Sequence, residues 1–148
     1  MKFKTFLICW IPAFIIVFAL NAVFHTLLAA DFFDQELAHL SPPISKMKEG
    51  NPAWVALLDI VLTFSMTYFI LVRQTGKIAW KNAAFTGGLI NLISSGAWHF
   101  VNAAMFTWSM VFLYSDMAWH IALGAGGGLI IAAIYNRVLE SNWLKNSK

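Results

Sequence analysis

The sequence predicts an all-α, polytopic membrane protein with four transmembrane helices, and three observations support this prediction. Of the 148 residues, 59% are hydrophobic and 11% are charged, whereas soluble domains carry about 25% charged residues. The mean hydropathy is +0.68. The apolar residues form long runs, each near the roughly 20 residues that cross a bilayer as a helix, and the charged residues gather at the ends of these runs.

We expect one domain, 1–148, because the length suits a single compact bundle. The first apolar run is longer than the roughly 7–15 residues of a signal-peptide apolar region. A retained first helix is therefore the favoured interpretation, and a cleaved signal peptide ending near Ala30 is the alternative. The four spans cover about 6–30, 53–72, 82–104 and 110–135, and a polar outer loop covers 31–52.

Two connecting segments need separate predictions. In the outer loop, Phe33, Leu37 and Leu40 recur at helical spacing, which predicts a short helix over 31–40 on the membrane surface. The segment 105–114 is apolar and aromatic and contains no glycine or proline. We interpret it as a tight connector that is buried between the third and fourth helices.

The distribution of lysine and arginine predicts the orientation. Cytoplasmic loops of membrane proteins carry the excess of these residues, so we expect both termini to be cytoplasmic, in a bacterial-type inner membrane. The net charge of +3 is scattered over segment ends, which argues against a nucleic-acid partner. In this orientation the inner side holds Lys2, Lys4, Arg73, Lys77, Lys81, Arg137, Lys145 and Lys148, and the outer side holds Lys46 and Lys48.

Each predicted helix has one stripe of polar or small residues spaced three or four apart, the spacing that puts side chains on one helix face. Because lipid penalises exposed polar groups, we expect the four stripes to face one another. Gly124 and Gly128 also form a pattern typical of close helix packing. The stripes are Asn21 and His25; Asp59, Thr63 and Thr67; Asn91, Ser95, His99 and Asn102; and Asp116, His120, Gly124 and Gly128.

The four stripes also reach similar depths. Counted at about 1.5 Å per residue from the nearest inner-side lysine or arginine, Asn21, Asp59, His99 and His120 rise about 21–27 Å. His25, Asn102 and Asp116 rise about 31 Å. Since the hydrocarbon core is about 30 Å thick, the sequence predicts one polar cluster in the outer half of the membrane.

Ionisable residues inside membrane segments often mark functional sites. The sole cysteine, Cys9, excludes an internal disulfide and a multi-cysteine metal site, and the chain has no phosphate-binding glycine loop, nucleophile elbow or HExxH motif. The candidates for a ligand or metal site are His25, Asp59, His99, Asp116 and His120, supported by the polar residues Asn21, Asn91, Ser95 and Asn102.

Three hypotheses for this cluster stay open. Imidazoles and carboxylates from separate helices are ligands that zinc, copper or iron accept, and haem with axial His99 and His120 is a variant. A proton relay or a pocket for a polar ligand is the second. In the third, Asp116 pairs with His120 one turn away, the asparagines bridge helices, and the chain is a structural or partner-binding subunit without chemistry. Enzymatic activity, a protein partner and homo-oligomer formation stay open, and the lipid bilayer is the expected environment.

A few residues also resemble a known pattern. Asp116 and Trp119 form an aspartate-x-x-tryptophan motif in the last predicted helix, and Asn102 ends the third. This arrangement, clearest over Trp108–Ala125, resembles an uncharacterised family of small four-helix bacterial integral membrane proteins. The resemblance implies that fold and a membrane location, and it implies no activity. The chain departs from the family pattern at Asn21 and Phe24, which replace an acid and a tryptophan, at Val101, which replaces a threonine, and at His99, which replaces an acid.

Overall fold

The computed structural model describes residues 3–38, 52–72, 74–105 and 109–146. Its secondary structure over these ranges is entirely helical, which confirms the all-α prediction. The elements are α1 (Phe3–Val23), the π-helical segment η1 (Phe24–Leu28), α2 (Ala30–Ala38), α3 (Pro52–Leu71), α4 (Trp80–Met105) and α5 (Met110–Asn146).

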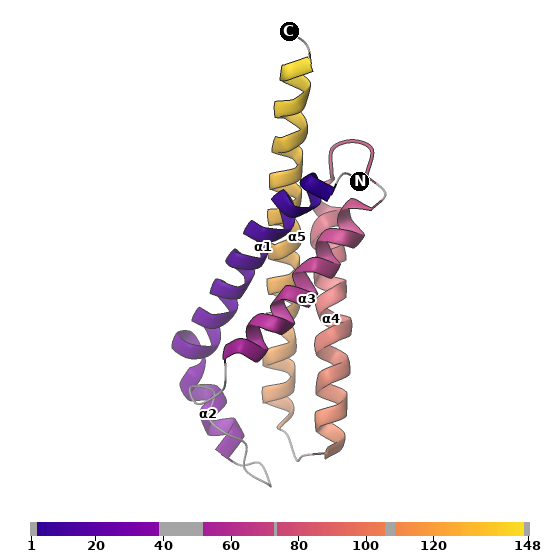
Figure 1. Cartoon of the computed structure of the whole chain (residues 1–148). Coiled ribbons are helices and arrows are strands. Elements are labelled where there is room, and N and C mark those ends of the chain that lie inside the picture. Colours follow the sequence, from indigo (N-terminus) through magenta and orange to yellow (C-terminus); the bar gives the residue numbers. More distant parts are fainter. Residues whose placement is uncertain (1–2, 39–51, 73, 106–108, 147–148) are drawn as a thin grey trace.

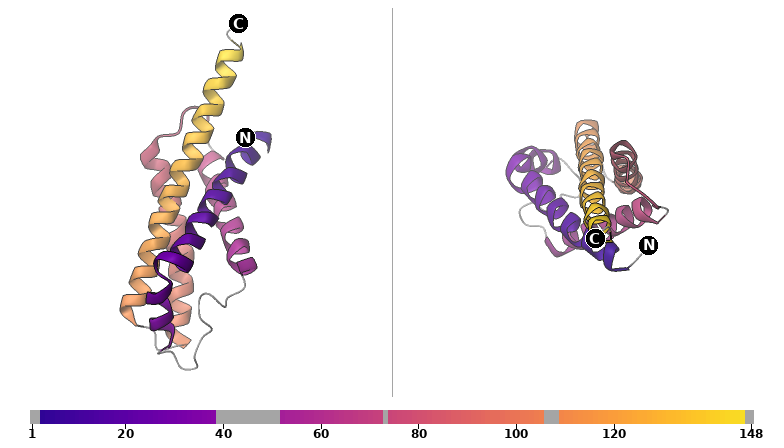
Figure 2. Two further views of the ribbon diagram at one scale, coloured as in Figure 1. Left: turned by 90° about the vertical axis from the view of Figure 1, so that its left-hand side faces the viewer. Right: turned by 90° about the horizontal axis from the view of Figure 1, so that it is seen from above.

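The four long helices run alternately up and down, with α5 in the middle of the group (Figures 1 and 2). Helix α5 contacts α1, α3 and α4, and α3 also contacts α1 and α4. Helix α1 begins and α5 ends at one end of the molecule, whereas α2 lies at the other end (Figure 1). The residues of η1, the second half of α4 and the start of α5 therefore lie towards the α2 end.

The predicted helix positions agree with the structure except near the fourth helix. Helix α5 continues to Asn146, beyond the predicted end at 135, because 136–146 contains no glycine or proline. The prediction of a buried connector over 105–114 is confirmed for Phe112 and Leu113, which are buried, and is wrong for other residues of the segment; 106–108 lie outside the described residues. Helix α4 ends at Met105 and α5 already begins at Met110, and both methionines are exposed, as are Val111 and Tyr114. These side chains lie on the outer surface of the helix group, where apolar residues suit lipid.

Three described helices are long and apolar enough to cross a membrane: Phe3–Leu28, Ala53–Leu71 and Met110–Ser141. The chain thus has several apolar helices of membrane-spanning length. Helix α4 is not among these three, because its inner face contains the polar residues Asn91, Ser95 and His99. Its outward-facing side chains are nevertheless large and apolar, as exposed Phe85 and Phe100 show.

Helices α4 and α5 pack backbone against backbone at three glycines. A methyl group added at Gly87 would overlap the Gly124 carbonyl, and one added at Gly128 would overlap the Ala83 carbonyl. A methyl group at Gly124 would likewise meet Asn91. The small residues therefore allow the close approach that the sequence pattern predicts, and they fix the register between α4 and α5.

An apolar cluster fills the molecule at the end away from α2. It includes Cys9, Met66, Ile70, Ile131 and Tyr135, which come from α1, α3 and α5. Beside it, the Asn136 amide accepts from the Ile78 backbone N–H at 2.8 Å and donates to the Ile78 carbonyl at 3.1 Å. These contacts hold the turn before α4 against α5, and they leave the opposite half of the bundle for the polar groups.

Candidate functional site

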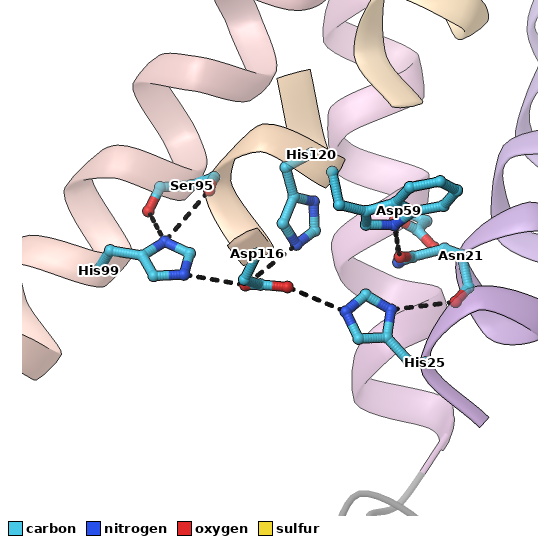
Figure 3. Close-up of polar contacts among 8 residues, drawn as sticks. Asn21, His25, Asp59, Ser95, His99, Asp116 and His120 are labelled. Carbon is cyan, nitrogen blue, oxygen red and sulfur yellow. Dashed lines mark hydrogen bonds and ion pairs between the residues drawn. The ribbon is translucent and has the colours of Figure 1, made fainter. Parts of the chain in front are cut away.

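Three histidines surround the Asp116 carboxylate, and each comes from a different element (Figure 3). His25 of η1 lies with Nε2 3.0 Å from Oδ1. His99 of α4 lies with Nε2 2.9 Å from Oδ2, and His120 of α5 lies with Nε2 3.7 Å from the same oxygen. The exposed fractions of the four side chains are small: 16% for His25, 5% for His99, 12% for His120 and 11% for Asp116.

The glycine contacts explain why His99 faces Asp116. Gly87 lies against Gly128, and one turn further along α4 Asn91 lies against Gly124. His99 lies two further steps of four residues along α4 from Asn91. Asp116 lies two steps of four residues back along α5 from Gly124. His99 and Asp116 are therefore opposite each other. Residues four apart share a helix face, so the close approach at the glycines continues as a polar seam to the carboxylate.

The π-helical segment presents His25 to the same carboxylate. The segment spans Phe24–Leu28, and its wider turn closes where the Ala29 N–H donates to the Phe24 carbonyl at 2.8 Å. Single π-turns inserted in helices are frequent at functional sites. Beyond it, Phe33 of α2 is fully buried and stacks on the His25 ring with centroids 5.2 Å apart, so α2 covers the site at this end.

The other ring nitrogens of two histidines are already occupied. His25 Nδ1 lies 3.0 Å from the Asn21 carbonyl, and His99 Nδ1 lies 2.6 Å from the Ser95 carbonyl. A carbonyl oxygen only accepts, so each Nδ1 must hold the proton. In a neutral ring, each Nε2 then carries a lone pair, and this lone pair faces a carboxylate oxygen. Two acceptors at this distance require a proton between them, on the ring or on the carboxyl group, or a cation bound to both.

His120 is the third histidine beside Asp116, and it makes no hydrogen bond to the carboxylate. Its Nε2 is 3.7 Å from Asp116, which is too long for a hydrogen bond. Among the described residues its buried Nδ1 has no hydrogen-bond partner. The ligand atoms of His25, Asp116 and His120 all lie within 4.8 Å of one another. A tetrahedral site with bonds of about 2.0–2.1 Å has its ligand atoms roughly 3.3 Å apart, so small side-chain rotations would bring these three onto one metal ion.

A second polar group adjoins the histidines. The Asn21 amide Nδ2 donates to both oxygens of Asp59, at 3.1 and 3.4 Å. The Trp119 indole N–H donates to Asn21 Oδ1 at 3.1 Å, and the indole stacks on Phe24 with centroids 3.8 Å apart. Asn21 therefore connects α1, α3 and α5 one turn before His25.

The structure brings together most of the residues that the sequence selected, but not all. Asp59 does not face the histidines, because its carboxylate is turned to Asn21. Asn91 lies further along α4, where its amide donates to the Gly87 carbonyl at 3.3 Å. The side chain of Asn102 lies outside the described residues. Gly124 and Gly128 lie in the contact with α4.

The aromatic residues around the site were not selected as site residues. Trp119, Phe24 and Phe33 contact Asn21 or His25 and restrict how those side chains are oriented. The aspartate-x-x-tryptophan spacing of Asp116 and Trp119 was the available signal, since both side chains reach the α1 side of α5. Nothing in the sequence distinguishes Phe33 from the many lipid-facing phenylalanines.

Comparison with known proteins gives one match. No curated protein and no solved structure matches the chain significantly. The sequence profile of the family described as "Predicted membrane protein (DUF2177)" matches residues 6–136, which run from the start of α1 into the last helix. The match covers most of the chain, and the family is one of unknown function. The chain therefore belongs to this membrane protein family, in agreement with the resemblance seen at Asp116 and Trp119.

Proposed function

We propose that this membrane protein binds one divalent transition-metal ion through His25, Asp116 and His120, whose ligand atoms lie within 4.8 Å of one another, and that His99, 2.9 Å from Asp116 Oδ2, turns in as the fourth ligand. One observation carries the proposal: imidazole Nε2 atoms face the carboxylate oxygens while the opposite Nδ1–H groups are held by backbone carbonyls. Metal-binding histidines usually donate their second ring N–H to a carbonyl or carboxylate, which fixes the ring and its tautomer. His25 and His99 both follow this pattern.

His120 favours a metal ion over protons alone. A chain of protonated rings would explain His25 and His99, each at hydrogen-bond distance from Asp116. It would leave His120 without a role, since its Nε2 is beyond hydrogen-bond distance. As a third imidazole ligand, the same ring supplies the donor that a four-coordinate site needs.

The donor set limits the class of ion. Three imidazoles and one carboxylate suit zinc, iron, copper or another first-row divalent ion, and the lack of a nearby thiolate disfavours a soft ion such as Cu(I). Haem is a weaker fit, because His99 and His120 both direct Nε2 at Asp116 Oδ2, where an iron would have to lie. The bound ion would polarise a ligand or lower the pKa of a bound water.

We further propose four crossings with both termini cytoplasmic, in a bacterial-type inner membrane. Helix α4 has 26 residues, so it is about 39 Å long and exceeds the roughly 30 Å hydrocarbon core. The polar side chains Asn91, Ser95 and His99 are buried, and beyond Lys81 and Asn82 at its start the exposed residues of α4 are apolar, which supports a crossing of α4 beside α5. The whole chain is then a single four-helix domain, with the metal site in the outer half of the membrane.

Cobalt titration tests the metal site. Protein purified in detergent, stripped with a chelator and titrated with Co²⁺ should bind one ion per chain and develop the visible absorption of a four- or five-coordinate N/O site. Asp116→Asn and His99→Gln should weaken binding by more than about 100-fold, since loss of outer-shell partners already costs 10–100-fold. Glu140→Gln, an equivalent change at an exposed carboxylate that pairs with Lys77, should leave the affinity unchanged.

Failure of the wild-type chain to bind Co²⁺, Zn²⁺ or Fe²⁺ stoichiometrically would overturn the metal proposal. The second candidate function would then be a buried network of protonated groups. The contacts of His25 and His99 with the two oxygens of Asp116 favour it. In that case nitrogen NMR of labelled histidines should detect rings with protons on both nitrogens. Singly protonated rings without metal would leave a structural or partner-binding role.

A further inference from the structure

We infer that Asp59 is a positioning residue of the metal centre, acting through Asn21 and supplying the second negative charge of the buried site. This inference rests on the proposed metal site and goes beyond it, because Asp59 lies outside the group of ligands. It assigns a role in the metal site to a carboxylate that also links α3 to α1 through Asn21.

Asp59 is fully buried within a membrane-crossing helix. In the part of the chain that the structure describes, no lysine or arginine contacts its carboxylate, and the Asn21 amide donates to both of its oxygens. A buried carboxylate with a neutral donor and no cation is costly. Such a carboxyl group is either protonated or compensated by a positive charge nearby, and the proposed ion supplies that charge.

The path from Asp59 to the ligands has two links. Asp59 holds the side chain of Asn21, and the backbone carbonyl of Asn21 accepts from His25 Nδ1–H. Asn21 Oδ1 also accepts from the Trp119 indole, which adjoins His120 in the sequence of α5. Asp59 thus fixes the segment of α1 that orients one ligand, and it contacts that segment from a helix that contributes no ligand.

The charges of the site agree with this assignment. A divalent ion bound by neutral imidazoles and Asp116 leaves one net positive charge in the membrane interior. Among the described residues, the buried carboxylate outside the ligand group is Asp59, which is bonded to Asn21. Together, the two carboxylates and one divalent ion are neutral, which lowers the cost of holding the ion away from water.

The test compares Co²⁺ affinity, the visible spectrum and thermal stability in detergent. Asp59→Asn removes the charge, while the replacement amide still offers an oxygen to Asn21 Nδ2. We expect this variant to bind Co²⁺ about 10–100-fold more weakly than wild type, with a melting temperature close to wild type in the absence of metal. Asp59→Glu should recover part of the affinity, because it restores the charge.

Trp119→Phe removes the other hydrogen bond to the Asn21 side chain, so it tests whether the orientation of Asn21 matters without a change at Asp59. The phenyl ring keeps the stack on Phe24 but has no N–H for Asn21 Oδ1. We expect a smaller loss of affinity and a shifted Co²⁺ spectrum, because His25 is less firmly oriented. Thr67→Val is the matched control on the same helix: Thr67 is fully buried and donates only within α3, to the Thr63 carbonyl at 2.8 Å.

The outcomes separate the two proposals. If wild type fails to bind metal, the proposed function and this inference both fall. If wild type binds and Asp59→Asn binds equally well, this inference falls and the metal site stands. Weak binding by Thr67→Val to the same degree would also overturn it, because any buried change in α3 would then suffice. Should Asp59→Asn fail to fold, unchanged affinity and an unchanged spectrum in Asn21→Ala, which removes the side chain that Asp59 holds, would overturn it.

Discussion

His25 and Asp116 are 91 residues apart in the chain, and the His25 Nε2 lies 3.0 Å from an Asp116 oxygen. This contact joins the first long helix to the last and needs α1 and α5 to pack side by side, which they do. Changes that move either helix should therefore affect metal binding as well as stability.

Alanine at Gly124 should destabilise the protein and weaken metal binding. The added methyl group would meet Asn91 and the Gly87 backbone, so α4 and α5 must separate. Overpacking of this kind costs about 1–3 kcal/mol, and the separation would move His99 away from Asp116. Thermal unfolding in detergent and Co²⁺ titration measure the two effects.

Gly126 provides the control for that experiment. No atom lies within 4 Å of a methyl group added there, although Gly126 is in the same helix. Gly126→Ala should keep wild-type affinity and gain up to about 1 kcal/mol from helix propensity. Equal losses in the two alanine variants would contradict the glycine packing described for α4 and α5.

Phe33→Ala should destabilise the α2 end of the molecule and speed the release of bound metal. Phe33 is fully buried against His25, Phe24 and Phe112, and removal of such a ring costs about 3–5 kcal/mol. The measurements are the melting temperature and the rate at which a chelator removes Co²⁺. Phe100→Ala removes the same ring from an exposed position on α4 and should change neither. If release is as fast in both variants, α2 does not cover the site.

Acidification should release the ion. A metal-binding imidazole must be unprotonated, so protons compete for the three histidines as the pH falls. The dissociation constant for Co²⁺ should rise steeply between about pH 8 and about pH 5, the range in which histidine changes its charge. Parallel titrations of wild type at fixed ionic strength measure it. A dissociation constant that stays constant over this range would be incompatible with imidazole ligands.

Cysteine labelling should place Ala38 and Ser141 on opposite sides of the membrane. Both residues are exposed, one at the end of α2 and one near the end of α5. In a Cys9→Ala background, a membrane-impermeant maleimide should label Ala38→Cys in intact cells and label Ser141→Cys only after permeabilisation. Labelling of both without permeabilisation, or the reverse order, would exclude four crossings with cytoplasmic termini.

Local periodicity made much of this arrangement predictable from sequence. Residues three or four apart share a helix face whatever the tertiary structure, so the stripes with Asn21, Asp59, His99 and Asp116 could be identified before their contacts were known. Depth counting placed Asn21 and Asp59 in one layer, and they bond each other. It placed His99 and Asp116 about one turn apart, yet the packing of α4 on α5 brings them opposite each other, with Nε2 2.9 Å from Oδ2.

Features that depend on non-local packing could not be read from the sequence. No amino-acid pattern in Phe24–Leu28 distinguishes the π-turn from an ordinary helical turn, and this turn changes the direction in which His25 projects. Asp59 and Asp116 are equally plausible partners for histidines until the helices are packed; the structure turns one to Asn21 and the other to three imidazoles. The exposure of Met110 and Tyr114 likewise depends on which side of α5 the other helices occupy.

The division of the polar contacts between the two halves of the chain has a consequence for biogenesis. Helices α1 and α3 leave the ribosome first, and they can already form Asn21–Asp59 and Trp10–Thr63 with each other. The second hairpin, α4 with α5, brings its own His99–Asp116 contact. Each hairpin can therefore enter the bilayer with much of its polarity already satisfied, and His25–Asp116 and Trp119–Asn21 then join two preassembled halves.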